Sequence, residues 1–403
     1  MDLTTFNWLR SAAGAEILAD LANRELRESA VLPELERLRR SLPAEHARAA
    51  VELALLRQRA APRFPNAERL FFTREALEQA SAAPVAAHRA ARMAGIATID
   101  SIADLCCGIG GDALAFAAAG LHVTAVDRDP LRLAMVQANA DMSGLADRVT
   151  ILTLDLLRDP PPQAGALFCD PGRRAGGRRR FHSEAYEPPL SQVLRWRRPS
   201  QPLAIKLAPG IDPAELPTDA ELEFVSLDGD LKEAVIWYAP DQVRRRATLL
   251  RRSTNDAVHH VEMTEHSVIN APPTLSTPRN WLYEPDPAVI RAGLVRELAT
   301  RLGLAQLDPS IAYLTGDQFV ATPFARGWPI YEWLPFQLKR LNARLRELDA
   351  GAVTVKKRGS PLDTDILAKR LSGTGTQALV VTLTQLAGKP IALICGPPHT
   401  AYR

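Results

Sequence analysis

Four short segments of the chain carry glycines and carboxylates at spacings that suit nucleoside chemistry. The first is Asp104-Leu-Cys-Cys-Gly108-Ile-Gly110-Gly111-Asp112, which follows the apolar pair Ile102-Ala103 and precedes the alanine-rich run Ala113–Ala119. This order predicts a strand, a tight glycine turn and a helix. Because glycine has no Cβ, the backbone N–H groups of such a turn can approach a ligand closely. We therefore interpret the segment as a nucleoside-binding turn.

The charge around this turn indicates which nucleoside it binds. Gly108 to Ala113 satisfies the G-x-G-x-x-A fingerprint of dinucleotide-binding folds. However, Asp104 would place a negative charge near the phosphates of a nicotinamide dinucleotide. S-adenosylmethionine has a sulfonium and an amino group but no phosphate, so it suits an acidic rim better. We expect Asp104 to face its cationic end, with Cys106, Gly108 and Gly110 against the cofactor.

Two further carboxylates follow the next two expected strands. Asp127, with Arg128 after it, can accept both ribose hydroxyl hydrogens. Asp129 is a candidate N-cap for a helix that begins near Pro130. Asp155 can accept from the adenine amine. Taken singly, such aspartates are more often loop or cap residues, but together they lie at successive strand ends, where open α/β sheets bind ligands.

The adenine end and the acceptor end of the site complete this set. The Leu156 N–H is placed to meet an adenine ring nitrogen. Asp170-Pro171 ends the fourth strand, and the alternative for it is a plain strand-ending turn. An exocyclic amine is a poor nucleophile because its lone pair is delocalised into the ring. The Asp170 carboxylate and the Pro171 carbonyl could accept its hydrogens and localise that lone pair for attack on a methyl group.

The elements that must position these residues alternate along the chain. Residues 1–95 show helical spacing of apolar residues, and residues 96–240 alternate strands with helices. Seven strands are expected: Ser101–Leu105, His122–Val126, Val149–Leu152, Ala166–Cys169, Leu203–Lys206, Leu222–Ser226 and Glu233–Tyr238. This predicts a seven-stranded, doubly wound, Rossmann-like α/β sheet. The last two strands are joined by a short link typical of a hairpin. Residues 241–328 and 329–403 read as two small α+β modules.

Composition narrows the class of protein. The hydrophobic content of 46% and the charged content of 24% are ordinary for a folded soluble protein. No apolar run reaches the roughly 18 residues that span a bilayer, and the N-terminus lacks a signal-peptide pattern, so we expect a cytoplasmic protein that binds no membrane. Four cysteines make no disulfide framework, and no zinc-ligand spacing is present, so no metal is expected.

Basic residues gather in clusters although the net charge is only +3. These clusters are Arg173-Arg174, Arg178–Arg180, Arg195, Arg197-Arg198, Arg244–Arg246, Arg251-Arg252 and Lys356–Arg358. They are typical either of a phosphate-binding surface, and hence of RNA as a partner, or of a solvated arginine-rich surface.

The four segments together resemble class I S-adenosylmethionine-dependent methyltransferases over residues 96–240. The Asp-x-x-Cys-Gly-x-Gly-Gly form looks most like RNA methyltransferases of the trimethylguanosine synthase type. Over the whole chain, the stretches Thr73–Ser81, Lys206–Gly210 and Gly316–Phe324 resemble bacterial methyltransferases with a THUMP-like C-terminal domain. That resemblance implies a ferredoxin-like module over 241–328 and a THUMP-like module over 329–403.

The resemblance is incomplete at the acceptor end. Amine methyltransferases typically carry an aromatic residue after their Asp-Pro-Pro, which stacks on a flipped base. Here Gly172 and Arg173 follow Asp170-Pro171. Stacking would have to come from an aromatic residue further on or from the guanidinium plane of Arg173. The candidate substrate contacts are Arg173, Arg174, Phe181, Tyr186, Trp196 and Lys206.

Several functions stay open on the sequence alone. The favoured one is an S-adenosylmethionine-dependent methyltransferase that modifies a base, preferably at an exocyclic amine, in a structured RNA. The alternatives are a small-molecule or protein methyltransferase on the same core, a non-catalytic RNA-binding protein with a vestigial methyltransferase fold, and, more distantly, a dehydrogenase.

Overall fold

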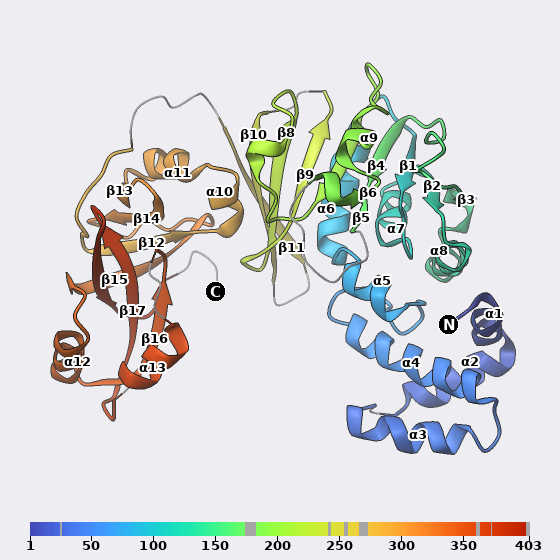
Figure 1. The fold of residues 1–403 in the computed structure, drawn as a ribbon, viewed down its shortest axis with the longest axis horizontal. Helices are drawn as coiled ribbons and strands as arrows, with labels where there is room; N and C mark the ends of the chain where they lie inside the picture. Colours follow the sequence, from blue (N-terminus) through green and yellow to red (C-terminus); the bar gives the residue numbers. More distant parts are fainter. Residues whose placement is uncertain are drawn as a thin grey trace. The chain divides into compact units, whose positions relative to one another are not determined.

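The chain forms two compact units (Figure 1). The computed structural model describes residues 1–24, 26–173, 183–240, 243–253, 257–265, 273–359, 363–371 and 373–399. The first unit comprises Met1–Glu221 and Glu233–Gln242, and the second comprises Leu222–Lys232 and Val243–Arg403.

The described residues that precede the first strand form helices joined by turns, as expected. The helices are α1 (Leu3–Arg10), α2 (Ala12–Ala22), α3 (Val31–Leu38), α4 (Ala44–Ala60), α5 (Arg74–Gln79) and α6 (Ala83–Ala94). Thr73 caps α5, because its side chain accepts a hydrogen bond from the Ala76 N–H. The apolar core of α1–α4 includes Phe6 and Leu53 and extends to Ile109 of the glycine turn and Met135 of the following segment. These helices therefore support the turn.

The first unit contains a mixed α/β sheet. Its strands pair in the order β9-β7-β4-β1-β2-β3. They are β1 (Ser101–Leu105), β2 (His122–Asp127), β3 (Val149–Thr153), β4 (Ala166–Cys169), β7 (Leu203–Leu207) and β9 (Asp230–Tyr238). The strands β1, β2, β3, β4 and β7 run parallel to one another, while β9 runs antiparallel to β7. The helices α7 (Gly111–Ala118) and α8 (Pro130–Ser143) connect β1 to β2 and β2 to β3.

The chain reverses its direction of travel across this sheet between β1 and β4. The segments β1, β2 and β3 follow one another outward, and the chain then returns to pair β4 with the other side of β1. Such a switch point leaves a crevice at the carboxyl ends of the strands, where ligands of α/β sheets bind.

The predicted count of seven strands needs correction. The expected strand Leu222–Ser226 exists as β8 (Glu221–Leu227), but it pairs in parallel with β10 (Arg245–Arg252) of the second unit. In turn, β10 pairs in an antiparallel manner with β11 (Val258–Thr264). The predicted sheet did not include β10 and β11, because the predicted domain boundary fell at residue 240.

Short elements complete the described part of the first unit. They are the paired β5 (Gly172–Arg173) and β6 (Tyr186–Glu187), the helix α9 (Leu190–Leu194), and 3-10 turns at Glu28–Ala30, Ala146–Arg148, Ser183–Ala185 and Pro213–Glu215. The β5–β6 pair follows directly on Asp170-Pro171, so it fixes the direction in which the chain leaves β4.

The second unit is built on a seven-stranded sheet in the order β13-β14-β12-β15-β18-β17-β16. These strands are β12 (Trp281–Pro285), β13 (Ala305–Asp308), β14 (Ile311–Gly316), β15 (Ala325–Pro335), β16 (Ala350–Lys357), β17 (Gln377–Leu386) and β18 (Lys389–Cys395). The helices are α10 (Pro287–Arg291), α11 (Val295–Leu302), α12 (Leu338–Glu347) and α13 (Thr364–Leu371). Between α10 and α11, Gly293 adopts a φ of +76°.

The division of the chain into four domains stays a prediction. The predicted boundary at residue 328 falls inside β15, a strand that pairs with both β12 and β18. In the parts of the chain that the structure describes, no helix combines the length and the apolar character needed to cross a membrane.

Candidate active site

The glycine turn after β1 has the open backbone that the sequence predicted. Cys106, Gly108 and Gly110 all adopt positive φ values, of +63°, +58° and +85°. A Cβ added to Gly110 would lie 3.1 Å from a methyl group of Val136, so a larger residue would crowd α8. At Gly108, a Cβ would meet no atom within 4 Å. The turn is therefore packed on the α8 side at Gly110 and open at Gly108.

Asp104, at the end of β1, is a buried carboxylate without a hydrogen-bond partner. Its side chain is 1% exposed, and neither carboxylate oxygen has a partner within the described residues. Burial, and secondarily the nearby charge of Asp170, raises the pKa of Asp104 to about 8. An orphaned buried carboxyl group costs free energy unless a donor or a cation meets it. Asp104 is thus a candidate to meet a cationic ligand.

Asp127, at the end of β2, holds the turn from the opposite side. It is 5% exposed, its Oδ2 accepts a hydrogen bond from the Gly108 N–H at 3.0 Å, and its Oδ1 accepts one from the Asp129 N–H at 3.0 Å. Each oxygen keeps a further lone pair for a ligand hydroxyl. Asp129 caps α8 through the Leu131 N–H, as predicted. The Arg128 guanidinium lies 3.3 Å from Glu187 and is largely exposed.

Asp155 and Leu156 follow β3. The Asp155 Oδ1 accepts from the Leu157 N–H at 3.1 Å, which is the local turn bond of an ordinary loop aspartate. Leu156 is buried, and its carbonyl accepts a hydrogen bond from the Gln192 side chain at 2.7 Å. The second carboxylate oxygen of Asp155 lies 3.4 Å from the Arg158 guanidinium.

Asp170, at the end of β4, pairs with Lys206 of β7. The Lys206 Nζ lies 2.5 Å from the Asp170 Oδ2, and the side chains are 14% and 33% exposed. The Asp170 N–H bonds the Leu105 carbonyl, which ties it to the end of β1 beside Asp104. The structure therefore brings Asp104, Asp170 and Lys206 together at the carboxyl edge of the sheet. Pro171 is buried immediately after Asp170.

Two of the other expected substrate contacts, Arg173 and Tyr186, lie in the short β5–β6 ribbon. Tyr186 is 3% exposed, and its hydroxyl accepts a hydrogen bond from the Ala208 N–H at 3.1 Å. It therefore supports β7 as a packing residue. The backbone of Arg173 pairs with Tyr186 in the β5–β6 ribbon. Arg174 and Phe181 lie outside the described residues.

A buried ionic network lies beneath the turn, and the sequence analysis missed it. Arg89 of α6 is completely buried. Its guanidinium contacts Asp112 at the start of α7 and Glu233 of β9, the latter at 2.6 and 2.7 Å. Ser81 donates to Asp112 at 3.3 Å. Arg89 also lies over the Phe168 ring, 4.7 Å from its centroid. No local pattern marks this network, since Arg89 and Glu233 are 144 residues apart.

Asn139 of α8 is a second positioning residue that the sequence analysis did not identify. Its side chain is 2% exposed and exchanges two hydrogen bonds with the backbone of Phe71, at 2.7 and 3.1 Å. It also donates to the Ile109 carbonyl inside the glycine turn, at 3.2 Å. Asn139 therefore fastens the N-terminal helical segment and the turn to the same point of α8.

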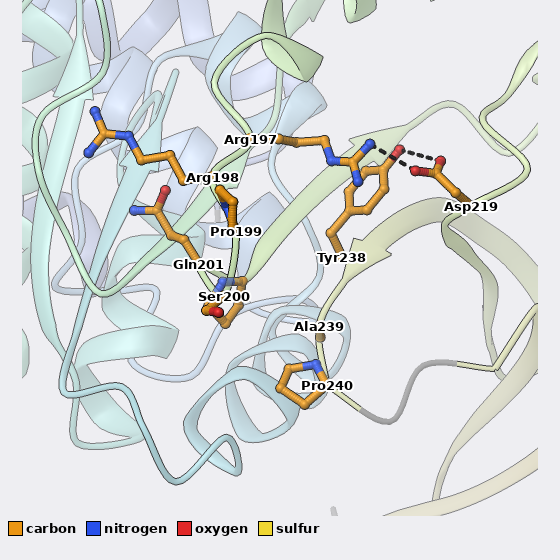
Figure 2. Close-up of a pocket in the computed structure, with 10 residues that line it drawn as sticks. Arg197, Arg198, Pro199, Ser200, Gln201, Asp219, Tyr238, Ala239 and Pro240 are labelled. Atoms are coloured by element: carbon orange, nitrogen blue, oxygen red, sulfur yellow. Dashed lines mark hydrogen bonds and ion pairs between the residues drawn. The ribbon is translucent and has the colours of Figure 1, made fainter.

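A pocket of about 640 Å³ lies at the edge of the first unit's sheet where β7 begins, opposite the carboxyl edge that holds Asp104. Figure 2 shows Arg197 over the ring of Tyr238, with both side chains bonded to Asp219. The lining segment 197–202 precedes β7, and Tyr238 ends the antiparallel β9. The pocket thus sits at the amino end of β7, away from Asp104 and Asp170, and it contains none of the predicted site residues.

The residues at the carboxyl edge fit a cationic nucleoside cofactor. The Asp104 carboxylate has no hydrogen-bond partner in the described part of the chain, so the cationic end of a cofactor could pair with it. The open space at Gly108 leaves room for a ligand against the backbone. Burial raises the pKa of the Cys107 and Cys169 thiols, so both stay protonated and neither is a nucleophile. Among the described residues, no group of three or more His, Cys, Asp or Glu side chains is arranged to hold a metal ion.

The sheet, its switch point and the strand-end carboxylates define a nucleoside-binding α/β enzyme of the methyltransferase type. A solved structure from Porphyromonas gingivalis W83, provisionally assigned as a methyltransferase, has the same fold. It is 20% identical, covers 93% of this chain and 99% of its own, and has a TM-score of 0.68.

Sequence comparisons give the family. Residues 99–180 match the RNA cap guanine-N2 methyltransferase family, residues 325–397 match the THUMP domain-like family, and residues 2–60 match a domain family of unknown function. Two relatives from strains of Mycobacterium tuberculosis are uncharacterized S-adenosylmethionine-dependent methyltransferases. Each is 37% identical over 364 residues, which are 86% of this chain and 96% of the relative. The chain belongs to this family of S-adenosylmethionine-dependent methyltransferases with a THUMP-like domain.

Proposed function

We propose that the enzyme methylates a base in a structured RNA, with an exocyclic amine as the favoured acceptor. The observation that carries the proposal is the position of Asp170. It ends β4 at the switch point, beside the buried Asp104, within the segment that is similar to the RNA cap guanine-N2 methyltransferases. The similarity of residues 325–397 to the THUMP domain adds support for RNA as the partner.

Each residue of the carboxyl edge has a proposed role toward the cofactor. Asp104 faces the cationic methionine end, and Gly108 and Gly110 offer their backbone. Asp127 accepts the ribose hydroxyls through the lone pairs that Gly108 and Asp129 leave unused.

The remaining contacts of the cofactor are proposed with them. Asp155 and Leu156 face the adenine, and Cys106 and Arg128 lie at the rim of the turn. S-adenosylmethionine supplies an electrophilic methyl group.

The catalytic contribution of the chain is to orient the acceptor. The Asp170 carboxylate and the Pro171 carbonyl each accept a hydrogen bond from one N–H group of the amine. These bonds localise the nitrogen lone pair and direct it at the methyl group. The Asp170 carboxylate can hold the proton that the nitrogen releases on methylation. Lys206, which now bonds the Asp170 Oδ2, keeps that carboxylate oriented until an amine N–H takes its place.

The experiment is a nucleoside analysis of RNA from a strain that lacks this protein. Digested RNA from this strain and its parent is compared by mass spectrometry, and the purified enzyme with S-adenosylmethionine should restore the missing modification. Modification of a ribose hydroxyl instead of a base would overturn the amine assignment. Restoration of no RNA modification, with methylation of a protein or small molecule instead, would favour the alternative substrates.

RNA binding is tested separately through its salt dependence. If the enzyme neutralises several phosphates, its affinity for RNA should fall steeply between about 50 and 200 mM salt. Affinity that does not change with salt would contradict a phosphate-binding surface. An enzyme that binds RNA but not S-adenosylmethionine would support the non-catalytic alternative.

A further inference from the structure

An aromatic surface lies on the second unit, at some distance along the sequence from every residue given a catalytic role. Its members are Trp281 of β12, Phe319 of the loop after β14, Tyr331 of β15 and His399 near the C-terminus. Ring centroids are 4.8 Å apart for Trp281 and Phe319, 5.4 Å for Phe319 and His399, and 5.1 Å for Trp281 and His399. Three rings from distant parts of the sequence thus meet in one cluster.

Tyr331 lies on β15 two residues after Pro329, at a point where the pairing of β15 with β18 shifts register between Ile330 and Glu332. Trp281 lies directly opposite Pro329 in the sheet, so their side chains share one face. The Tyr331 hydroxyl lies over Gly396, where a Cβ would overlap it and also approach Pro329. Tyr331 is 56% exposed, and His399 is exposed too, while Trp281 and Phe319 are half-buried. The rings of Tyr331 and His399 are therefore open to solvent, while Trp281 and Phe319 anchor the surface to the sheet.

The backbone holds these rings rigidly in place. Tyr283 clamps the Phe319 loop, because its hydroxyl donates to the Gln318 carbonyl at 3.0 Å and accepts from the Val320 N–H at 2.7 Å. Gly327 lets the Phe319 ring lie against β15, since a Cβ there would stand 2.9 Å from the ring. His399 exchanges two backbone hydrogen bonds with Gly327, at 2.7 and 3.1 Å. Rings that are already ordered lose little entropy on binding.

The charge of the second unit indicates what kind of partner such rings meet. By sequence, this unit holds 22 Lys and Arg against 16 Asp and Glu, a net charge of +6, whereas the first unit holds 27 against 30, a net charge of −3. Exposed aromatic rings within a basic module are the combination that binds single-stranded nucleic acid, since bases stack on the rings and basic groups attract the phosphates. An acidic peptide would use the charge but not the flat rings.

We propose that the surface of Trp281, Phe319, Tyr331 and His399 binds an unpaired base of the RNA substrate by stacking. The inference rests on the proposed function for the identity of the RNA, but the binding itself is measured without methyl transfer. The motif Gly316–Phe324 gains a role in this way, because it carries Phe319 and the clamped loop.

The test uses the full chain and a fluorescein-labelled, single-stranded RNA 12-mer of mixed sequence. The double variant Tyr331→Ala with His399→Ala removes the two exposed rings and should weaken binding by about 5- to 150-fold, as loss of one stacked base does. Phe319→Leu is a second variant that keeps the apolar volume. The thermal unfolding midpoint of each variant shows whether it folds.

Trp333→Ala is the matched control. Trp333 is on the same strand as Tyr331 and is 37% exposed. It lies opposite Leu393 in the sheet. Leu393 packs with Trp328 in the core on the other face of β15, so Trp333 belongs to that face. We expect Trp333→Ala to bind the 12-mer as the unchanged protein does. Equal losses for Trp333→Ala and the double variant, or no loss in a folded double variant and in Phe319→Leu, would overturn the proposal.

Parallel assays separate this proposal from the proposed function. A protein that binds the 12-mer through these rings but modifies no RNA would retain the surface and overturn RNA methylation. If the enzyme modifies RNA but the double variant binds the 12-mer with unchanged affinity, RNA methylation would stand and the stacking surface would be overturned. Preference for a base-paired hairpin over the 12-mer would also count against stacking on an unpaired base.

Discussion

The two units of the chain place opposite charges in opposite settings. In the first unit, Asp104 and Asp127 are buried at the strand ends, and the unit is acidic overall. In the second unit, the net charge is positive and the aromatic rings of Tyr331 and His399 are exposed. In the proposed function, the buried carboxylates meet a cationic cofactor, and the low dielectric around them strengthens the attraction. The proposed RNA partner would instead meet a solvated basic surface, where long-range attraction suffices.

One chain can bind a cation and a polyanion if the two sets of charges are kept in separate folds. Changes in one unit should then leave the ligand of the other unit unaffected.

Replacement of Arg89 should have the largest effect on folding. Arg89→Met leaves the carboxylates of Asp112 and Glu233 buried without their cation. We expect a loss of about 3–5 kcal/mol in the free energy of unfolding, measured by denaturant titration. Arg10→Ala is the control, because its pair with Asp141 is solvent-exposed and should contribute at most about 1 kcal/mol. Equal losses in both variants would show that the buried network does not stabilise the turn.

Replacement of Asp170 should abolish turnover but spare both ligands. We expect Asp170→Ala to lower methyl transfer by at least about 100- to 1000-fold, since an aligned acceptor group is lost. Calorimetry should find unchanged S-adenosylmethionine affinity, and the RNA 12-mer should bind as before. Asp147→Ala, at an exposed position of a surface turn, should remain fully active. An active Asp170→Ala enzyme would remove the proposed catalytic role.

Replacement of Asp127 tests the cofactor half of the comparison. Asp127→Ala should weaken S-adenosylmethionine binding by about 1–3 kcal/mol, because the ribose acceptors and the bond to Gly108 are both lost. Asp129→Ala removes the cap of α8 and a partly exposed ion pair with Arg132, so it should cost about 1 kcal/mol of stability and leave cofactor affinity intact. Unchanged affinity in Asp127→Ala, measured by calorimetry, would contradict the ribose assignment.

The pH dependence of cofactor binding tests Asp104 alone. Because burial raises the pKa of Asp104 to about 8, the cofactor-free enzyme keeps this carboxyl protonated at lower pH. A bound cation favours the ionised form, so affinity should rise by up to about tenfold per pH unit below pH 8 and level off above it. Asp104→Asn should bind weakly with a flat profile. The same slope in both proteins would assign the proton to another group.

The same pKa shift affects stability in the opposite sense. The folded state holds the Asp104 proton up to about pH 8, whereas the unfolded chain releases it near its ordinary pKa of 3.8. Without cofactor, the free energy of unfolding should therefore fall as the pH rises from about 4 to 8. Asp104→Asn should lessen that fall, which a series of denaturant titrations would measure.

Short local patterns were enough to predict the turn, two of the strands, a helix cap and the class of cofactor. The glycine turn, the strands β1 and β4 with their bounds, the cap at Asp129 and the cofactor class all follow from short patterns. Such patterns are readable because backbone conformation and strand ends depend on neighbouring residues. The similarity of its motifs to methyltransferases likewise rests on residues close together in the sequence.

Contacts between residues far apart in the sequence became visible in the folded chain alone. The fold paired Lys206 with Asp170, buried Arg89 between Asp112 and Glu233, and turned Tyr186 from a stacking candidate into a packing residue. In addition, β8 pairs with β10, although the sequence placed β10 in a separate module that was predicted to begin at residue 241. These outcomes depend on burial and on contacts across many residues, and no local pattern of residue types encodes them.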